Sequence, residues 1–136
     1  MNMNRPVRIL NLITFLGFAL LTEPASPEPL SPIVKTVDLD LGESKKVTLY
    51  DGSIASIEVL DVEPVTDPVT QAVRQVQVTV LVNGEQTTIQ SGNYHLPVEA
   101  GGLQLDSPVT SHYLELASQD SWALEKDVRV RLWPQN

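Results

Sequence analysis

The most regular alternation of apolar and polar positions lies in the segment 73–90, VRQVQVTVLVNGEQTTIQ. Valines recur at every second position from 76 to 82, which is the pattern of a half-buried β-strand. Asn83-Gly84 is the dipeptide that best tolerates the two positive φ angles of a type I′ turn. The segment therefore predicts a β-hairpin, because a one-residue slip would turn all of these valines toward water. The predicted cross-strand pairs are Val80 with Thr87, Val78 with Ile89 and Thr79 with Thr88.

Two weaker alternations precede this hairpin. Apolar residues at 37, 39 and 41 alternate with polar ones and predict a first strand, which Gly42-Glu43-Ser44 ends. The segment 47–59 predicts a second hairpin around Asp51-Gly52. A two-residue loop there places Ser56 opposite Val47, whereas a three-residue loop over 51–53, or a bulge near Ala55, restores the apolar face. We expect the apolar face to decide, and hence Val47 to pair with Ile57.

The segment 63–72, EPVTDPVTQA, interrupts the strands with two prolines. Asp67-Pro68 has the form of a helix N-cap followed by proline at the first helical position. We expect one or two helical turns there. Because so short a helix is unstable alone, it should pack on the sheet through Val69 and Ala72.

The last third of the chain contains short apolar pieces between turn signals. Leu103 with Leu105 and Leu114 with Leu116 are such pieces, and Gly101-Gly102 and Ser107-Pro108 are the turn signals. A final strand follows at 128–132. Short strands at this spacing predict an all-β fold, a single small antiparallel β-sandwich or barrel of about seven or eight strands over residues 33–134.

The first residues have the layout of a secretory signal peptide. Arg5 and Arg8 precede an apolar run over 9–21, which is too short to span a bilayer. We expect a signal peptide over 1–25, then a stiff proline-rich linker over 26–32. A buried helix or an uncleaved anchor is the alternative. The predicted mature protein is secreted or periplasmic and has no membrane span.

The amino-acid composition narrows the kinds of protein and of binding partner that fit this chain. The chain has no cysteine, which excludes a disulfide framework and a lipid-modified cysteine and suits a bacterial envelope. The formal net charge of −8 argues against nucleic acid as a partner. Calcium binding is the more specific explanation for the excess of acidic residues, but no stretch of the sequence shows the alternating Asp and Asn ligands of a calcium loop.

Candidate chemistry is sparse. There is no G-x-S-x-G elbow, phosphate loop or dinucleotide fingerprint, so no catalytic residue, metal or cofactor is predicted. Zinc held by His95, Asp106 and His112 is the enzymatic alternative on spacing alone. Aromatic and polar tips in the loop-rich last third suit stacking on a sugar or peptide. The predicted ligand-binding residues are Tyr94, His95, Asp106, His112, Tyr113 and Trp122.

Two stretches, YHLPVEAGGLQLDSPVTSHY at 94–113 and DSWALEKDVRVRLWP at 120–134, resemble a known β-domain. It precedes the catalytic domain in secreted lysostaphin-like zinc metallopeptidases, which cut peptidoglycan cross-bridges. YDGSIASIEVLDV and AVRQVQVTVLVNGE are similar in order and spacing. The family's H-x-x-x-D and H-x-H zinc motifs are missing, since His95 is followed by LPVE and His112 by YLEL.

The resemblance implies a non-catalytic, exported β-domain of the bacterial cell envelope that binds or positions peptidoglycan or an envelope peptidase. The alternatives are an amino-terminal fragment of a peptidoglycan metallopeptidase and a purely structural spacer or self-association domain. The first strand, 37–41, or the last, 128–132, is the expected sheet edge. Arg129 and Arg131 oppose open pairing there, so we expect a monomer.

Overall fold

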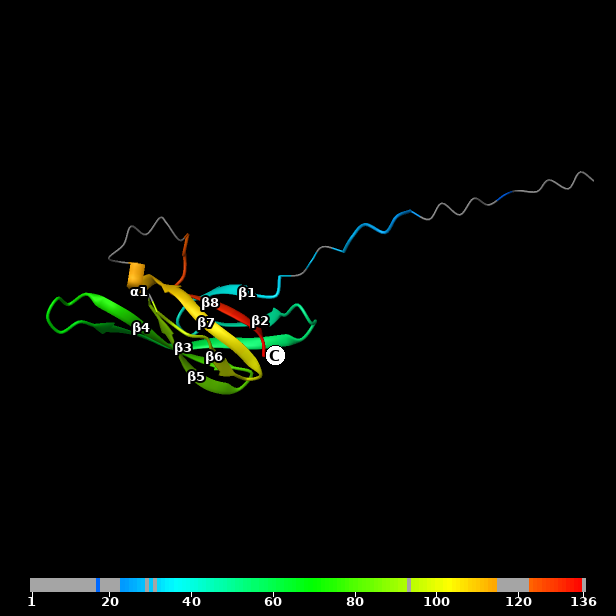
Figure 1. The fold of residues 1–136 in the computed structure, drawn as a ribbon. Helices are drawn as coiled ribbons and strands as arrows, with labels where there is room; N and C mark the ends of the chain where they lie inside the picture. The colour runs from blue at the N-terminus through cyan, green and yellow to red at the C-terminus, as the bar shows by residue number, and fades with distance from the viewer. Residues whose placement is uncertain are drawn as a thin grey trace, which may run out of the picture.

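The computed structural model describes residue 17 and residues 23–28, 30, 32–92, 94–114 and 123–135, with only the backbone of 113 and 114. This part of the chain consists of strands and one short helix (Figure 1). Their order is β1 (Lys35–Leu39), β2 (Ser44–Thr48), β3 (Ile54–Thr66), β4 (Val73–Val82), β5 (Glu85–Ser91), β6 (Val98–Ala100), β7 (Leu103–Thr110), α1 (Ser111–Leu114) and β8 (Val128–Pro134).

The strands form two antiparallel four-stranded sheets. One sheet has the order β1-β8-β7-β6, and the other is the meander β2-β3-β4-β5. Both sheets are open, so the predicted all-β fold is confirmed as a β-sandwich, and the barrel alternative is wrong. The edges β5 and β6 lie on the same side of the sandwich, and the chain crosses between the sheets from β5 to β6.

The core lies between the two sheets and follows the period-two pattern. Every second residue of β4, from Val76 to Val82, is fully buried. These valines meet aliphatic side chains of the other sheet, including Leu39, Leu105 and Leu132. Fully burying one such side chain stabilises the fold by roughly 1.5–3 kcal/mol, so stability rests on this alternation rather than on cross-links.

The β4–β5 hairpin is confirmed in its turn and in its register. Asn83 and Gly84 both have positive φ, at 48° and 84°, as a type I′ turn requires. Val80 faces Thr87, and Thr79 faces Thr88 with 3.4 Å between their hydroxyl oxygens. The side chain of Asn83 also donates to the carbonyl of Gly101, which ties this turn to the β6–β7 turn.

The register of the β2–β3 hairpin differs from the predicted one. Val47 faces Ala55 rather than Ile57, and the three-residue loop covers 50–52 rather than 51–53. The prediction is wrong because Ile57 already has a buried apolar neighbour on its other side, Val82 of β4, and belongs to the core between the sheets. Its partner on β2 can therefore be an exposed lysine, Lys45. The β3–β4 pairing shifts register between Val59 and Asp61 and between Val65 and Thr66, and neither shift is at Ala55.

The expected helical segment at 63–72 is reduced to a single turn, in which the Gln71 amide donates to the Asp67 carbonyl at 2.8 Å, and no helix follows it. β3 and β4 pair as far as Thr66 with Val73, and the residues between them close a hairpin loop. Asp67 does act as a cap, accepting from the backbone amides of Val69 and Thr70 at 2.9 Å. The Val69 side chain is 88% exposed, so its predicted packing on the sheet is wrong. Figure 1 shows the far ends of β3 and β4 projecting past the sandwich.

Ser107-Pro108 lies inside β7 and is not a turn, contrary to the sequence prediction. The pairing of β7 with β8 shifts between Asp106 and Val109, so the proline falls at a bulge, where its missing amide donor breaks no ladder bond. The Ser107 hydroxyl donates to the Arg129 carbonyl at 3.0 Å and holds the bulge to β8.

β1 is a sheet edge, as one of the two alternatives predicted, but β8 is not. β8 lies between β1 and β7, so its arginines do not guard an open edge. Arg129 instead pairs with Asp38 of β1, with 2.7 Å between Nε and Oδ1, and Arg131 pairs with Asp106 of β7. These pairs cross the outer face of the sheet and raise the pKa of both guanidinium groups.

Candidate functional site

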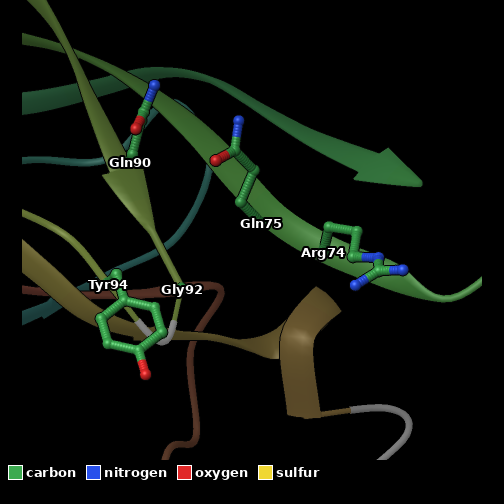
Figure 2. Close-up of a pocket in the computed structure, with 5 residues that line it drawn as sticks. All are labelled: Arg74, Gln75, Gln90, Gly92 and Tyr94. Atoms are coloured by element: carbon green, nitrogen blue, oxygen red, sulfur yellow. The ribbon is translucent and has the colours of Figure 1, made fainter. Parts of the chain in front are cut away.

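The connection between β5 and β6 exposes two large side chains that are two positions apart in the sequence. Tyr94 is 99% and Leu96 84% exposed. Neighbouring apolar side chains left in water on a folded domain mark interaction sites more often than isolated ones do. Figure 2 shows the Tyr94 ring beside Gly92, with Gln90 on β5 and Gln75 on β4 nearby.

Two shallow depressions flank Tyr94. The first, of about 340 Å³, lies toward β4 and is lined by Arg74, Gln75, Gln90, Gly92 and Tyr94 (Figure 2). The second, of about 430 Å³, follows the outer edge of β5; its lining is Thr88, Gln90, Tyr94, Leu96, Pro97 and Val98. We call these residues together the Tyr94 surface.

The strands dictate which side chains reach this surface. Because the valines of β4 point into the core, Gln75 and its period-two neighbours point outward. On β5, Ile89 and Ser91 are buried, while Thr88 and Gln90 are exposed. The result is a face of uncharged hydrogen-bonding groups beside an aromatic ring. Arg74 adds one cation at the rim, where its Nη2 lies 2.6 Å from the carboxylate of Asp67.

His95 turns away from the exposed side of the connection. Its Nδ1 lies 2.9 Å from the carbonyl of Gly92, and because a carbonyl only accepts, Nδ1 carries the hydrogen. Its Nε2 lies 3.7 Å from Oδ2 of Asp106, and its side chain is only 17% exposed. His95 therefore fixes the connection that carries Tyr94 rather than presenting itself to solvent.

Asp106 is buried on the outer face of β7, where it pairs with Arg131. Its side chain is 5% exposed, and both its oxygens accept from the guanidinium, with 2.8 Å between Oδ1 and Nε. The hydrogen bond to Asp106 is the main reason that the pKa of Arg131 is raised. A carboxylate already satisfied in this way serves to anchor β7 to β8, so we leave Asp106 out of the Tyr94 surface.

Two of the remaining predicted site residues, His112 and Tyr113, lie on α1, which contacts β4, the strand that carries Arg74 and Gln75. His112 lies on α1, and its buried Nδ1 has no hydrogen-bond partner within the described residues. Tyr113 is placed by its backbone alone, and Trp122 lies outside the described residues. His95 and Asp106 thus come together, but within the described part no three histidine, aspartate or glutamate side chains gather as a metal site would need. The alternative zinc site of His95, Asp106 and His112 therefore does not assemble.

Sequence reasoning missed Leu96 and the outward residues of the hairpin. The signal was present for the latter, because the same alternation that sends valines inward sends Gln75 and Gln90 outward. Leu96 carried no such signal, since nothing local separates an exposed leucine in a loop from a buried one.

Comparison of the chain with models of known protein families, with curated proteins and with solved structures gives no match. Within the described residues, no helix has the length and apolar character needed to cross a membrane.

Proposed function

We propose that this chain is a non-catalytic, exported β-domain of the bacterial cell envelope that binds or positions peptidoglycan or an envelope peptidase through the Tyr94 surface. One observation carries the binding role: Tyr94 and Leu96 stand almost fully in water between two depressions. The leader-like first residues support export, and the resemblance to a peptidase-associated β-domain supports the envelope and the partner class.

The chemistry of the surface suits binding rather than turnover. An aromatic ring and rows of glutamine and threonine side chains stack on and hydrogen-bond to neutral polymers, and they supply neither nucleophile nor acid–base pair. The sequence also has neither zinc motif of the peptidase family. We therefore propose that the domain places a partner or substrate for an enzyme and does not act on it itself.

Co-sedimentation of the purified protein with peptidoglycan sacculi tests the role. Tyr94→Ala should weaken retention roughly fivefold, because stacking contributes about 1 kcal/mol beyond plain burial. Tyr50→Ala is the matched control, since Tyr50 is also exposed but lies in the β2–β3 loop. Neither change should alter the melting temperature much.

No retention of the unmodified protein at moderate ionic strength would remove the peptidoglycan version and leave the protein partner. Equal retention of the Tyr94 and Tyr50 variants would show that the surface is placed wrongly.

A further inference from the structure

The outer edge of β5 carries backbone groups that no described strand satisfies. β5 pairs with β4 alone and ends its sheet. The pairing closes directly around a two-residue turn, so Val82 and Glu85 share a hydrogen-bonded pair, and such pairs recur at every second position. Thr88 and Gln90 fall between them. Their amide N–H and carbonyl groups therefore point away from β4, into the open edge.

This open edge borders the larger of the two depressions. Thr88 and Gln90 form one wall, and Leu96, Pro97 and Val98 form the opposite wall. Leu96 is in water, so the groove combines backbone donors and acceptors that no described strand satisfies with an exposed apolar side chain. A carbohydrate satisfies the apolar contact, but only an extended polypeptide offers N–H and C=O groups at the roughly 7 Å repeat that Thr88 and Gln90 present.

The charge pattern of the edges points to an uncharged occupant. The edge strand β2 exposes Lys45 and Lys46, which is how folded proteins ordinarily prevent pairing with another chain. Between residues 86 and 91, β5 has no charged side chain, although the chain carries a formal net charge of −8. Glu85, at the start of β5, is engaged by the Gly101 amide at 2.7 Å. The charged side chains that protect the edge of β2 from pairing are thus missing from the part of β5 that borders the groove.

We propose that β5 captures an extended, uncharged segment of a protein partner by strand addition, with one of its apolar side chains against Leu96 and Tyr94. This proposal rests on the proposed function, because it uses the same Tyr94 surface. Of the two partner classes named there, peptidoglycan and a protein, it selects the protein. The added strand hydrogen-bonds to the backbone of Thr88 and Gln90, and recognition between backbones in this way is sequence-tolerant, with specificity set by the Leu96 contact.

A displayed library of random peptides of about twelve residues supplies the probe, long enough to cover one strand and its flanks. Peptides selected on the purified protein are then titrated against Thr88→Pro and Thr88→Val. Thr88→Pro deletes the outward amide, which takes no part in the β4–β5 ladder, and proline is tolerated at an edge. Thr88→Val keeps the amide and removes only the hydroxyl.

The selected peptides should lose about tenfold in affinity with Thr88→Pro and stay within about twofold with Thr88→Val. Binding should slow hydrogen exchange at the amides of Thr88 and Gln90, because both become hydrogen-bonded. If Thr88→Pro does not fold, Gln90→Pro removes an equivalent outward amide, with Gln90→Val as its control.

Three results overturn strand addition: no peptide enriched above a blank selection, equal binding by the proline and valine variants, or exchange protection elsewhere. A dimer by light scattering that Thr88→Pro dissociates would make the occupant a second copy and overturn the partner. Sacculus retention that Tyr94→Ala abolishes and Thr88→Pro leaves intact would keep the proposed function and reject strand addition. Peptide binding without sacculus retention would leave strand addition and remove the peptidoglycan role.

Discussion

Removing one partner of the Asp106–Arg131 pair should cost very different amounts of stability depending on which partner is removed. The Asp106 side chain is 5% exposed, whereas that of Arg131 is 42% exposed. Arg131→Met leaves a buried carboxylate that has lost both guanidinium hydrogen bonds. Asp106→Asn leaves a guanidinium that already reaches water. The first change strands a charge, and the second does not.

The magnitudes follow from this asymmetry. A buried charge without its partner costs about 3–5 kcal/mol, and we take the lower end of that range, about 3 kcal/mol. The amide of Asp106→Asn keeps part of the hydrogen bonding, so its cost should be about 1 kcal/mol. For a domain of about 100 residues, the larger loss corresponds to a fall in melting temperature on the order of 15 °C.

Urea unfolding of both single variants and the double variant measures these values at pH 8. Adding Asp106→Asn to Arg131→Met should restore stability, because the stranded charge is then gone. The reasoning is refuted if Arg131→Met costs no more than Asp106→Asn, or if the double variant is less stable than Arg131→Met alone.

Two further changes test local features. Hydrogen bonds from the Thr70 amide, then from Arg74 and the Val69 amide, hold the pKa of Asp67 well below its usual range. The stability that the ionised Asp67 contributes to the fold is therefore present above about pH 4 and is lost as pH falls through the lowered pKa. Asp67→Asn should therefore lower the melting temperature at pH 7 and progressively less below pH 4; a difference independent of pH would contradict this. A Cβ on Gly101, where φ is +57°, would lie 2.4 Å from the Val82 carbonyl oxygen, so Gly101→Ala should cost about 3 kcal/mol. Gly102→Ala, at φ +76° with open space, should cost about 1 kcal/mol by urea unfolding, and equal losses would show that the contact with Val82 does not matter.

Features that depend on neighbours in the sequence were predicted in detail. The β4–β5 register follows from the alternation of the valines and from Asn83-Gly84, because a two-residue turn fixes pairing for the whole hairpin. The inward valines and leucine of β8 follow in the same way from period two. The Asp67 cap also formed, since its hydrogen bonds reach only two and three residues along the chain.

The site residues show where local pattern stops being informative. Sequence reasoning placed Tyr94, His95 and Asp106 in one candidate group, and the structure separates Tyr94, which points to solvent, from the other two. The side chains of His95 and Asp106 approach each other to 3.7 Å, and Asp106 pairs with Arg131. The period-two rule says that Arg131 faces away from the core, but not which strand lies beside β8. The partner of Arg131 therefore follows from strand order and not from spacing.

The sequence by itself determined the all-β class, the inward faces of the strands and the central hairpin, because each depends on contacts within a few residues. Tertiary structure decided the rest. Ile57 is buried in the core and has Val82 of β4 beside it, so its partner on β2 did not need to be apolar, and the β2–β3 register differs from the predicted one. Asp106 forms a structural ion pair with Arg131 because β8 lies between β7 and β1. Tyr94 and Leu96 stay in water because strand order puts β5 and β6 at sheet edges, so the connection that carries both side chains lies outside the core, an outcome that no local pattern encodes.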